Sequence, residues 1–214
     1  MKLIKPFRAL RPTRELAPQV ASPPYDVVSR AEAKIIAQGN PYSFLHINKP
    51  DIDVGDDIDA HDPSVYQTGR ANLDEFINSG ILVKDEIDSF YLYRQIMGDH
   101  EQIGLVAIAS IDAYESGSIK IHEFTRPDKE EDRVRHMMEL GAQVGPVFLT
   151  YNENPTLTDL MNEVAKGDPE YNFIDDSDIR HTFWLIQSSE LVMSIDNAFD
   201  GVDCLYVADG HHRS

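Results

Sequence analysis

The order of apolar and polar residues predicts a chain in which helices and strands are mixed. Short apolar runs typical of strands occur at 89–95, 103–111, 146–151, 181–187 and 203–208. Amphipathic periodicity predicts helices at 64–80, 129–140, 156–167 and 189–199. The first two strands, SFYLYRQ and IGLVAIASI, are separated by IMGDHEQ and predict a β-hairpin. Because helices and strands do not alternate strictly, the pattern favours an α+β fold, a mixed sheet with flanking helices.

The opening segment, LIKPFRALRPTRELAPQVASPPYDVVS, contains five prolines and predicts a short strand followed by an extended, ordered loop. Ser29 then has the character of an N-cap, with Glu32 three residues later. We therefore expect a helix over RAEAKIIAQG that ends at Gly39. A sub-boundary between domains is predicted near residues 80–90.

Composition indicates a folded globular protein, because 214 residues that are 42% hydrophobic can bury one large core or two small ones. The longest apolar stretch, IGLVAIASI, is too short to cross a bilayer, and the prolines near the start do not suit a signal peptide. The single cysteine, Cys204, cannot form an intramolecular disulfide. These features predict a cytoplasmic protein that does not act in a membrane.

Charge argues against general nucleic-acid binding, because the formal net charge is -18 and phosphate backbones select basic surfaces. We therefore expect a small-molecule substrate as the partner. Residues 1–50 nevertheless carry an excess of positive charge, and such a segment can receive a small anion. The alternative is that Lys2, Lys5, Arg8, Arg11 and Arg14 pair with acidic neighbours, and the sequence leaves both open.

The stretch DIDVGDDIDAHD has six aspartates within residues 51–62 and superficially resembles a calcium-binding loop. Its glycine stands at the wrong position and no glutamate ends it. We therefore interpret this stretch as a solvated acidic loop.

One group of chemically capable residues lies in IKIHEFTRPDKEEDR, residues 119–133, where a strand-like run leads through a charged loop into a helix. Arg126 or Lys129 can neutralise an anion there, and His122 or Glu123 can move a proton. The alternative is an ordinary solvated helix start, which acidic residues favour with or without a ligand.

A second group lies in ADGHHRS, directly after the last predicted strand. Gly210 permits a sharp turn or a close approach of backbone to ligand, and Arg213 offers a fork of donors to an anion. Asp209 can bind a metal ion, orient a histidine or accept a proton. His211 and His212 with Asp209 are also plausible ligands for zinc or iron. Adjacent residues on an extended chain point to opposite faces, and an arginine repels a metal, so an anion-binding turn is favoured over a metal site.

Five segments, PFRALRP, SPPYDVVS, NPYSFLHINKPDID, HEFTRPDKEEDR and LYVADGHHRS, together resemble a family of bacterial and archaeal proteins known as domain-of-unknown-function family 1015. The DGHHR element is also similar to the phosphate-binding turn of the ParB and sulfiredoxin superfamily. That superfamily includes kinases that phosphorylate free L-serine with ADP. Members of family 1015 are longer than this chain, so the resemblance implies that the chain is the N-terminal portion of a longer protein.

This resemblance implies a ParB/sulfiredoxin-like core around the N-terminal segment and the DGHHR turn. Gly210, His211, His212 and Arg213 would then hold the phosphates of ADP or ATP, and Asp209 would bind Mg²⁺ or orient the nucleophile. Glu123 or Asp26 would accept the proton of the acceptor hydroxyl. The implied function is phosphoryl transfer from a nucleotide to a small hydroxylated metabolite, free L-serine above all. The alternatives are a non-catalytic nucleotide-binding regulatory module and a metal-dependent hydrolase.

Three expectations about placement follow. The strand at 202–208 should be central, with Asp209 and Gly210 at its carboxyl end near Arg8 and Arg11. The loop at 122–129 and the turn at 209–213 should line one cleft. Residues 210–214 should be frayed and the chain alone inactive, because the helix that would complete the phosphate site requires residues after Ser214.

Overall fold

The computed structural model describes residues 2–122 and 125–213 and has the predicted α+β composition. The chain divides into two compact units. The first comprises Met1–Arg14, Lys84–His122 and Phe148–Asp209, and the second comprises Glu15–Val83, Glu123–Val147 and Gly210–Ser214. One crossing between the units therefore lies between Val83 and Lys84. In the described part of the chain, no helix is both long enough and apolar enough to span a membrane.

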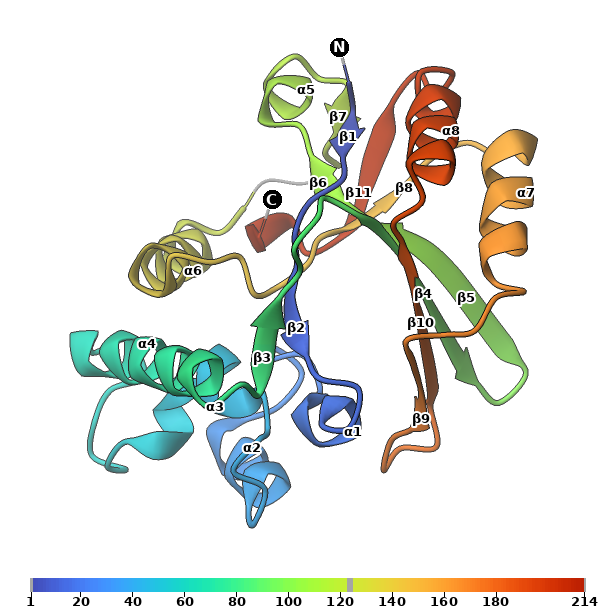
Figure 1. Cartoon of the computed structure of the whole chain (residues 1–214). Coiled ribbons are helices and arrows are strands. Elements are labelled where there is room, and N and C mark those ends of the chain that lie inside the picture. Colours follow the sequence, from blue (N-terminus) through green and yellow to red (C-terminus); the bar gives the residue numbers. More distant parts are fainter. Residues whose placement is uncertain (1, 123–124, 214) are drawn as a thin grey trace. The chain divides into compact units, whose positions relative to one another are not determined.

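The larger sheet of the first unit is antiparallel, with strand order β5-β4-β10-β9 (Figure 1). Its strands are β4 (Phe90–Met97), β5 (His100–Val106), β9 (Tyr171–Ile174) and β10 (Arg180–Ile186). The predicted β4-β5 hairpin is confirmed, but both strands extend into the predicted connection until only Gly98 and Asp99 join them. Gly98 has φ +57°, which suits glycine and explains why the turn can be so short. Strand β9 was not predicted from the sequence.

A three-stranded sheet in the same unit has the order β7-β11-β8. Strand β11 (Leu205–Asp209) lies in the centre, parallel to β7 (Ile119–Lys120) and antiparallel to β8 (Phe148–Thr150). The prediction of a central last strand is thus confirmed, and Asp209 stands at its carboxyl end. Leu205 and Val207 are almost completely buried, as expected for a strand with neighbours on both sides.

Short elements complete the first unit. Strand β1 (Ile4–Lys5) pairs with β6 (Ile108–Ala109), and helix α7 packs against α8. The remaining bounds are β2 (Leu10–Pro12), α5 (Ile111–Glu115), α7 (Pro155–Val164) and α8 (Ser189–Phe199).

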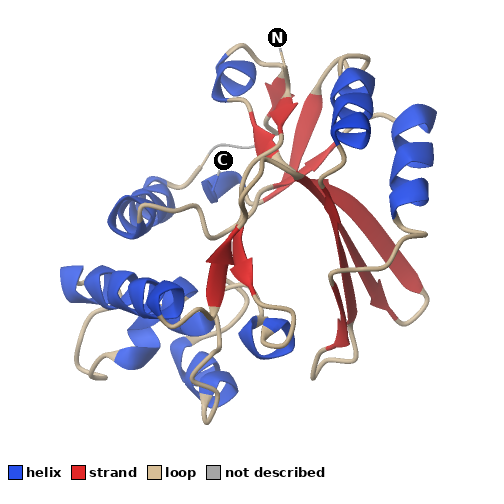
Figure 2. Ribbon diagram, in the orientation of Figure 1, coloured by secondary structure: helices blue, strands red, loops and turns tan. Residues whose placement is uncertain are grey.

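Helices dominate the second unit (Figure 2). They are α1 (Ala17–Val20), α2 (Arg30–Ala37), α3 (Leu45–Asn48), η1 (Pro50–Asp53), α4 (Pro63–Asn78), α6 (Pro127–Leu140) and η2 (His211–Arg213), and β3 (Leu82–Lys84) lies at the crossing. The predicted capping box of α2 is confirmed, because the Ser29 side chain accepts from the Glu32 N–H while the Glu32 carboxylate accepts from the Ser29 N–H. Helix α4 packs against both α3 and α6. The α+β composition does not by itself identify a ParB/sulfiredoxin-like core, which stays a prediction.

The basic opening segment is paired with carboxylates of the first unit. Arg11 is the most enclosed of these cations and binds Asp85 at 2.9 Å and Glu170 at 3.0 Å. Lys2 binds Asp196 and Asp200, Arg8 lies 3.6 Å from Asp88, and Arg14 binds Glu170. Of the two alternatives left open by the sequence, pairing with acidic neighbours therefore holds for these four cations. The predicted closeness of Arg8 and Arg11 to Asp209 stays a prediction.

The aspartates of residues 51–62 serve separate structural purposes. Asp62 caps α4 by accepting from the Ser64 N–H, Asp56 pairs with Lys34, and Asp53 accepts from the side chains of His46 and Asn72. Asp51 is 7% exposed, so the stretch is not uniformly solvated. Within the described residues, no group of three or more His, Cys, Asp or Glu side chains is arranged to hold a metal ion.

The contacts of His46 predict a pH dependence of stability. Its Nδ1 lies 2.9 Å from Asp53 Oδ2 and its Nε2 3.2 Å from the Asn40 carbonyl, so both nitrogens face acceptors and the imidazolium form is favoured. The hydrogen bond to Asp53 raises the pKa of His46 above its ordinary 6.5. The stabilisation is complete below pH 6.5 and is lost as the pH rises through the raised pKa. Asp53→Asn should therefore flatten the loss of unfolding free energy between pH 6.5 and 8.5, measured by urea denaturation. An unchanged pH profile in this variant would contradict the assignment.

Candidate functional site

The DGHHR turn begins at a glycine that no other residue can replace without strain. Gly210 has φ +84°, and a β-carbon added there would lie 2.9 Å from Nη2 of Arg213. The following three residues form one 3-10 turn, in which the Arg213 N–H donates to the Gly210 carbonyl at 2.8 Å. This turn packs against α6. In the described residues the turn thus closes its own hydrogen bond and has a packing partner, and the fraying of residues 210–214 stays a prediction.

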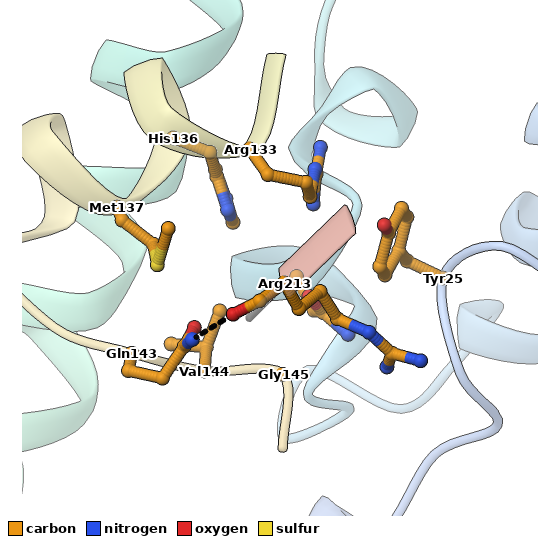
Figure 3. A pocket seen from close by; sticks show the side chains of 9 residues that line it. Tyr25, Arg133, His136, Met137, Gln143, Val144, Gly145 and Arg213 are labelled. Atoms are coloured by element: carbon orange, nitrogen blue, oxygen red, sulfur yellow. Dashed lines mark hydrogen bonds between the residues drawn. The ribbon is translucent and has the colours of Figure 1, made fainter. Parts of the chain in front are cut away.

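The Arg213 side chain is the centre of this turn, and 11% of it is exposed. Its methylene groups lie over Gly145, where an added β-carbon would come 2.9 Å from Cδ. Its guanidinium lies over Gly210, with Nη2 3.8 Å from Oδ2 of Asp26. The Arg213 carbonyl accepts a hydrogen bond from Gln143 Nε2 at 3.1 Å (Figure 3). Two glycines thus provide the room that this arginine occupies.

A second guanidinium, that of Arg133 on α6, is 12% exposed. Its Nε and Nη2 donate to Oδ2 of Asp132 at 2.8 and 2.5 Å, and its Cζ lies 4.0 Å from the centre of the Tyr25 ring. Oδ1 of Asp132 accepts from the Tyr66 hydroxyl and lies 2.9 Å from Nδ1 of His61. Burial raises the pKa of Asp132, but the Arg133 charge and these hydrogen bonds outweigh it and lower the pKa below its usual range. Asp132 is therefore a fixed anionic anchor for Arg133.

Both arginines line one narrow pocket of the second unit (Figure 3). Its volume is about 10 Å³, close to the space that one water molecule needs. Asn48 also lines it, is 8% exposed, and its Oδ1 has no hydrogen-bond partner among the described residues. The described residues that line it are Tyr25, Asn48, Arg133, His136, Met137, Gln143, Val144, Gly145 and Arg213.

His136 adds a neutral imidazole to this pocket, and its one N–H donates to a backbone carbonyl. It is 1% exposed, and its Nε2 lies 3.0 Å from the Ile47 carbonyl. Burial, followed by the charge of Arg133, lowers the pKa of His136 to about 4. The imidazole is therefore neutral at physiological pH, and the positive charge of the pocket comes from the two arginines.

The second unit also contains the predicted site residues Arg126, Lys129, His211 and His212. The Arg126 N–H, at the N-cap of α6, donates to Nδ1 of His212 at 3.3 Å, and the His211 and His212 rings lie 4.3 Å apart. The loop and the turn therefore touch within the second unit, although none of the described residues that line the pocket belongs to 122–129. Lys129 is exposed on α6.

Two of the remaining candidates, His122 and Asp209, belong to the first unit. Glu123 lies outside the described residues. His122 belongs to the first unit, where its Nδ1–H donates to the Val207 carbonyl at 2.9 Å. Asp209 ends β11 in the first unit, and its role as a metal ligand stays a prediction.

Several pocket residues were not assigned from the sequence. Arg133 lay in the first predicted group without a role, and His136 follows it by three residues on the same helix. This spacing places both on one helix face and could have identified the pair. Tyr25 lies in SPPYDVVS and Asn48 in NPYSFLHINKPDID, two of the segments that resemble a family, whereas Gln143 and Gly145 carry no local signal.

The proximity of Arg133 to His136 gives a prediction for titration. Arg133→Gln removes a neighbouring positive charge, so the pKa of His136 should rise from about 4 toward its ordinary value. Histidine titration by NMR measures this directly. Arg135→Gln on the exposed side of α6 is the matched control and should leave the His136 titration unchanged.

In the wild type, the low pKa of His136 lowers the free energy of unfolding as the pH falls from 6.5 to 4, because the unfolded chain takes up the proton first.

A second prediction concerns the glycine beneath Arg213. Gly39→Ala is the reference, because Gly39 has φ +76° and an added β-carbon would meet no atom within 4 Å. That change should cost about 1–2 kcal/mol, the penalty for the left-handed conformation alone. Gly210→Ala carries the same penalty and must also displace the Arg213 guanidinium, so its free energy of unfolding should fall further. Equal losses in urea denaturation would show that Arg213 does not rest on Gly210.

Comparison with known proteins identified a matching family model. Neither the curated proteins nor the solved structures gave a match to this chain. A family model described as a protein of unknown function, DUF1015, matches residues 4–214. The match covers the segments of both units and every residue that lines the pocket. The chain therefore belongs to the DUF1015 family.

Proposed function

We propose that the pocket of the second unit binds a phosphate group of ADP or ATP. The observation that carries this proposal is that two guanidinium groups, each about nine-tenths buried, line the same narrow pocket. Burying a cation is unfavourable unless an opposite charge compensates for it. Asp132 and Asp26 supply opposite charge to Arg133 and Arg213, and a phosphate would add charge-assisted hydrogen bonds to both guanidinium groups.

Phosphate suits this pocket in charge, shape and donor type. A guanidinium offers paired N–H groups that match phosphate oxygens. The small volume admits a single oxygen-sized group at its buried end, so one phosphate oxygen would enter while the rest of the nucleotide stays outside. The neutral His136 and the Gln143 amide add no negative charge that would repel an anion.

We extend this proposal to phosphoryl transfer from the nucleotide to a small hydroxylated metabolite, with free L-serine as the first acceptor to test. Such transfer requires positioning and charge neutralisation more than covalent catalysis, and two arginines provide both. Asp26 would accept the proton of the acceptor hydroxyl, and Glu123 is the alternative base. Mg²⁺ usually binds through one or two carboxylates together with substrate phosphates, so Asp26 or Asp209 would supply an oxygen ligand.

A second candidate function is a regulatory module that binds the nucleotide without chemistry. The described residues that line the pocket include no carboxylate that could act as a base, which favours this function. The two functions share the phosphate pocket and differ in whether a product forms.

Calorimetric titration with ADP, ATP and inorganic phosphate tests the phosphate site. Arg213→Ala should weaken nucleotide binding by about 1.5–3 kcal/mol, the range for a hydrogen bond to a charged group, which is about 10- to 100-fold in Kd. Arg135→Ala, which removes an exposed arginine paired with Glu131, is the matched control and should leave Kd unchanged. Equal affinity in wild type and Arg213→Ala would refute the phosphate site.

A separate measurement tests transfer. The protein is incubated with L-serine, Mg²⁺ and ADP or ATP, and phosphoserine is followed by ³¹P NMR. Asp26→Asn should abolish the product while nucleotide binding persists. Nucleotide binding without any phosphorylated product would support the regulatory module instead.

A further inference from the structure

The first unit contains a chain of three hydrogen-bonded side chains that the phosphate pocket does not involve. The Tyr93 hydroxyl on β4 lies 2.6 Å from Nδ1 of His181 on β10. Nε2 of the same histidine lies 3.1 Å from Oδ2 of Asp175, in the turn that follows β9. A hydroxyl, an imidazole and a carboxylate in this order form the arrangement that activates a nucleophile through a general base.

The proton positions in this chain follow from the acceptors. Asp175 is ionised, because hydrogen bonds from Ile179, His181 and Ser177 outweigh the effect of burial and lower its pKa. Its carboxylate must accept from Nε2–H of His181, which leaves Nδ1 as an acceptor in the neutral ring. Burial raises the pKa of Tyr93 to about 12, so its hydroxyl keeps its proton and donates to Nδ1. The Tyr93 hydroxyl thus donates to one imidazole nitrogen of His181, and the other nitrogen donates to the Asp175 carboxylate.

The sheet holds these groups in place. His181 stands opposite Phe173 and diagonal to Tyr93, and its ring is stacked between theirs at centroid distances of 5.1 and 6.0 Å. The other carboxylate oxygen of Asp175 accepts from the N–H groups of Ser177 and Ile179. The imidazole therefore has a fixed plane and a fixed tautomer.

The sheet face beside Tyr93 is open and aromatic. Gly104 stands directly opposite Tyr93 on β5, and a β-carbon added there would meet no atom within 4 Å. Phe183, opposite Tyr93 on β10, and Phe173 are only partly buried. A flat aromatic group has room over Gly104 and apolar rings to pack against.

We propose that Tyr93 is the nucleophile of an acyl-transfer site that accepts aryl esters. The Tyr93 oxygen attacks the ester carbonyl and its proton passes to Nδ1 of His181, while Asp175 stabilises the imidazolium. The bond from the carbonyl carbon to the aryl oxygen then breaks, and the departing phenolate takes the proton from His181. The products are an acylated Tyr93 and a free phenol, so atoms, protons and electrons balance without any further reactant. This site is independent of the phosphate pocket.

The test uses the whole protein with p-nitrophenyl acetate as the probe. Release of p-nitrophenol is followed by absorbance, and peptide mass spectrometry measures acetylation at each residue. Acetylation should occur at Tyr93 and disappear in Tyr93→Phe, which keeps the ring. His181→Phe keeps the stacking but removes the base, and should slow acetylation of Tyr93 about 100-fold, a typical contribution of general-base catalysis. Asp175→Asn should slow it as well, because the tautomer of His181 is no longer fixed.

Two controls separate this chemistry from general tyrosine reactivity and from unfolding. Tyr206, 38% exposed on β11, is the reference tyrosine, and its acetylation should be slow and the same in wild type and all three variants. Thermal unfolding of each variant shows whether the sheet is retained. Folded variants that acetylate Tyr93 as fast as wild type, or a wild type in which Tyr93 reacts no faster than Tyr206, would overturn the proposal.

Discussion

The burial of two guanidinium groups is the constraint on which the polar architecture of the second unit depends. Arg133 and Arg213 remain charged at any accessible pH, so each needs hydrogen-bond acceptors, a compensating charge or an aromatic face. Asp132 and the Tyr25 ring provide these for Arg133. Arg213 instead lies over Gly145 and Gly210, which have no side chains that would occupy the same space. Two buried guanidinium groups thus line one pocket, and this is the physical basis for proposing an anion there.

The same reasoning distinguishes the tyrosines on the sheet of the first unit. The Tyr91 hydroxyl donates to Asp85 and the Tyr171 hydroxyl to the Pro12 carbonyl, so both groups tie the sheet to neighbouring segments. Tyr93 differs because its partner, His181, can accept a proton. A buried hydroxyl needs a partner in every case, but the chemical type of that partner decides whether the contact is structural or reactive.

Local signals in the sequence accounted for much of the fold and for part of the site. The capping residues Ser29 and Glu32 identified the start of α2, and the apolar run 203–208 identified a central strand. Gly210 and Arg213 were assigned from chemistry alone, since a glycine before an arginine after a buried strand suggests an anion-binding turn. The contacts of that turn with α6 were not predicted, because α6 lies far away in the sequence.

The sequence by itself determined features that are encoded within a few residues. These are the mixed α+β class, the N-terminal cap of α2, the hairpin and the position of the DGHHR turn. The pocket was decided by the tertiary structure, because it joins Tyr25, Asn48, Arg133 and Arg213 from four segments of the chain. Likewise, His136 is neutral because the packed unit buries it, and the residues next to it in the sequence do not produce this burial. Residue type and spacing give the available chemistry, whereas distance, burial and charge compensation arise only when distant segments pack together.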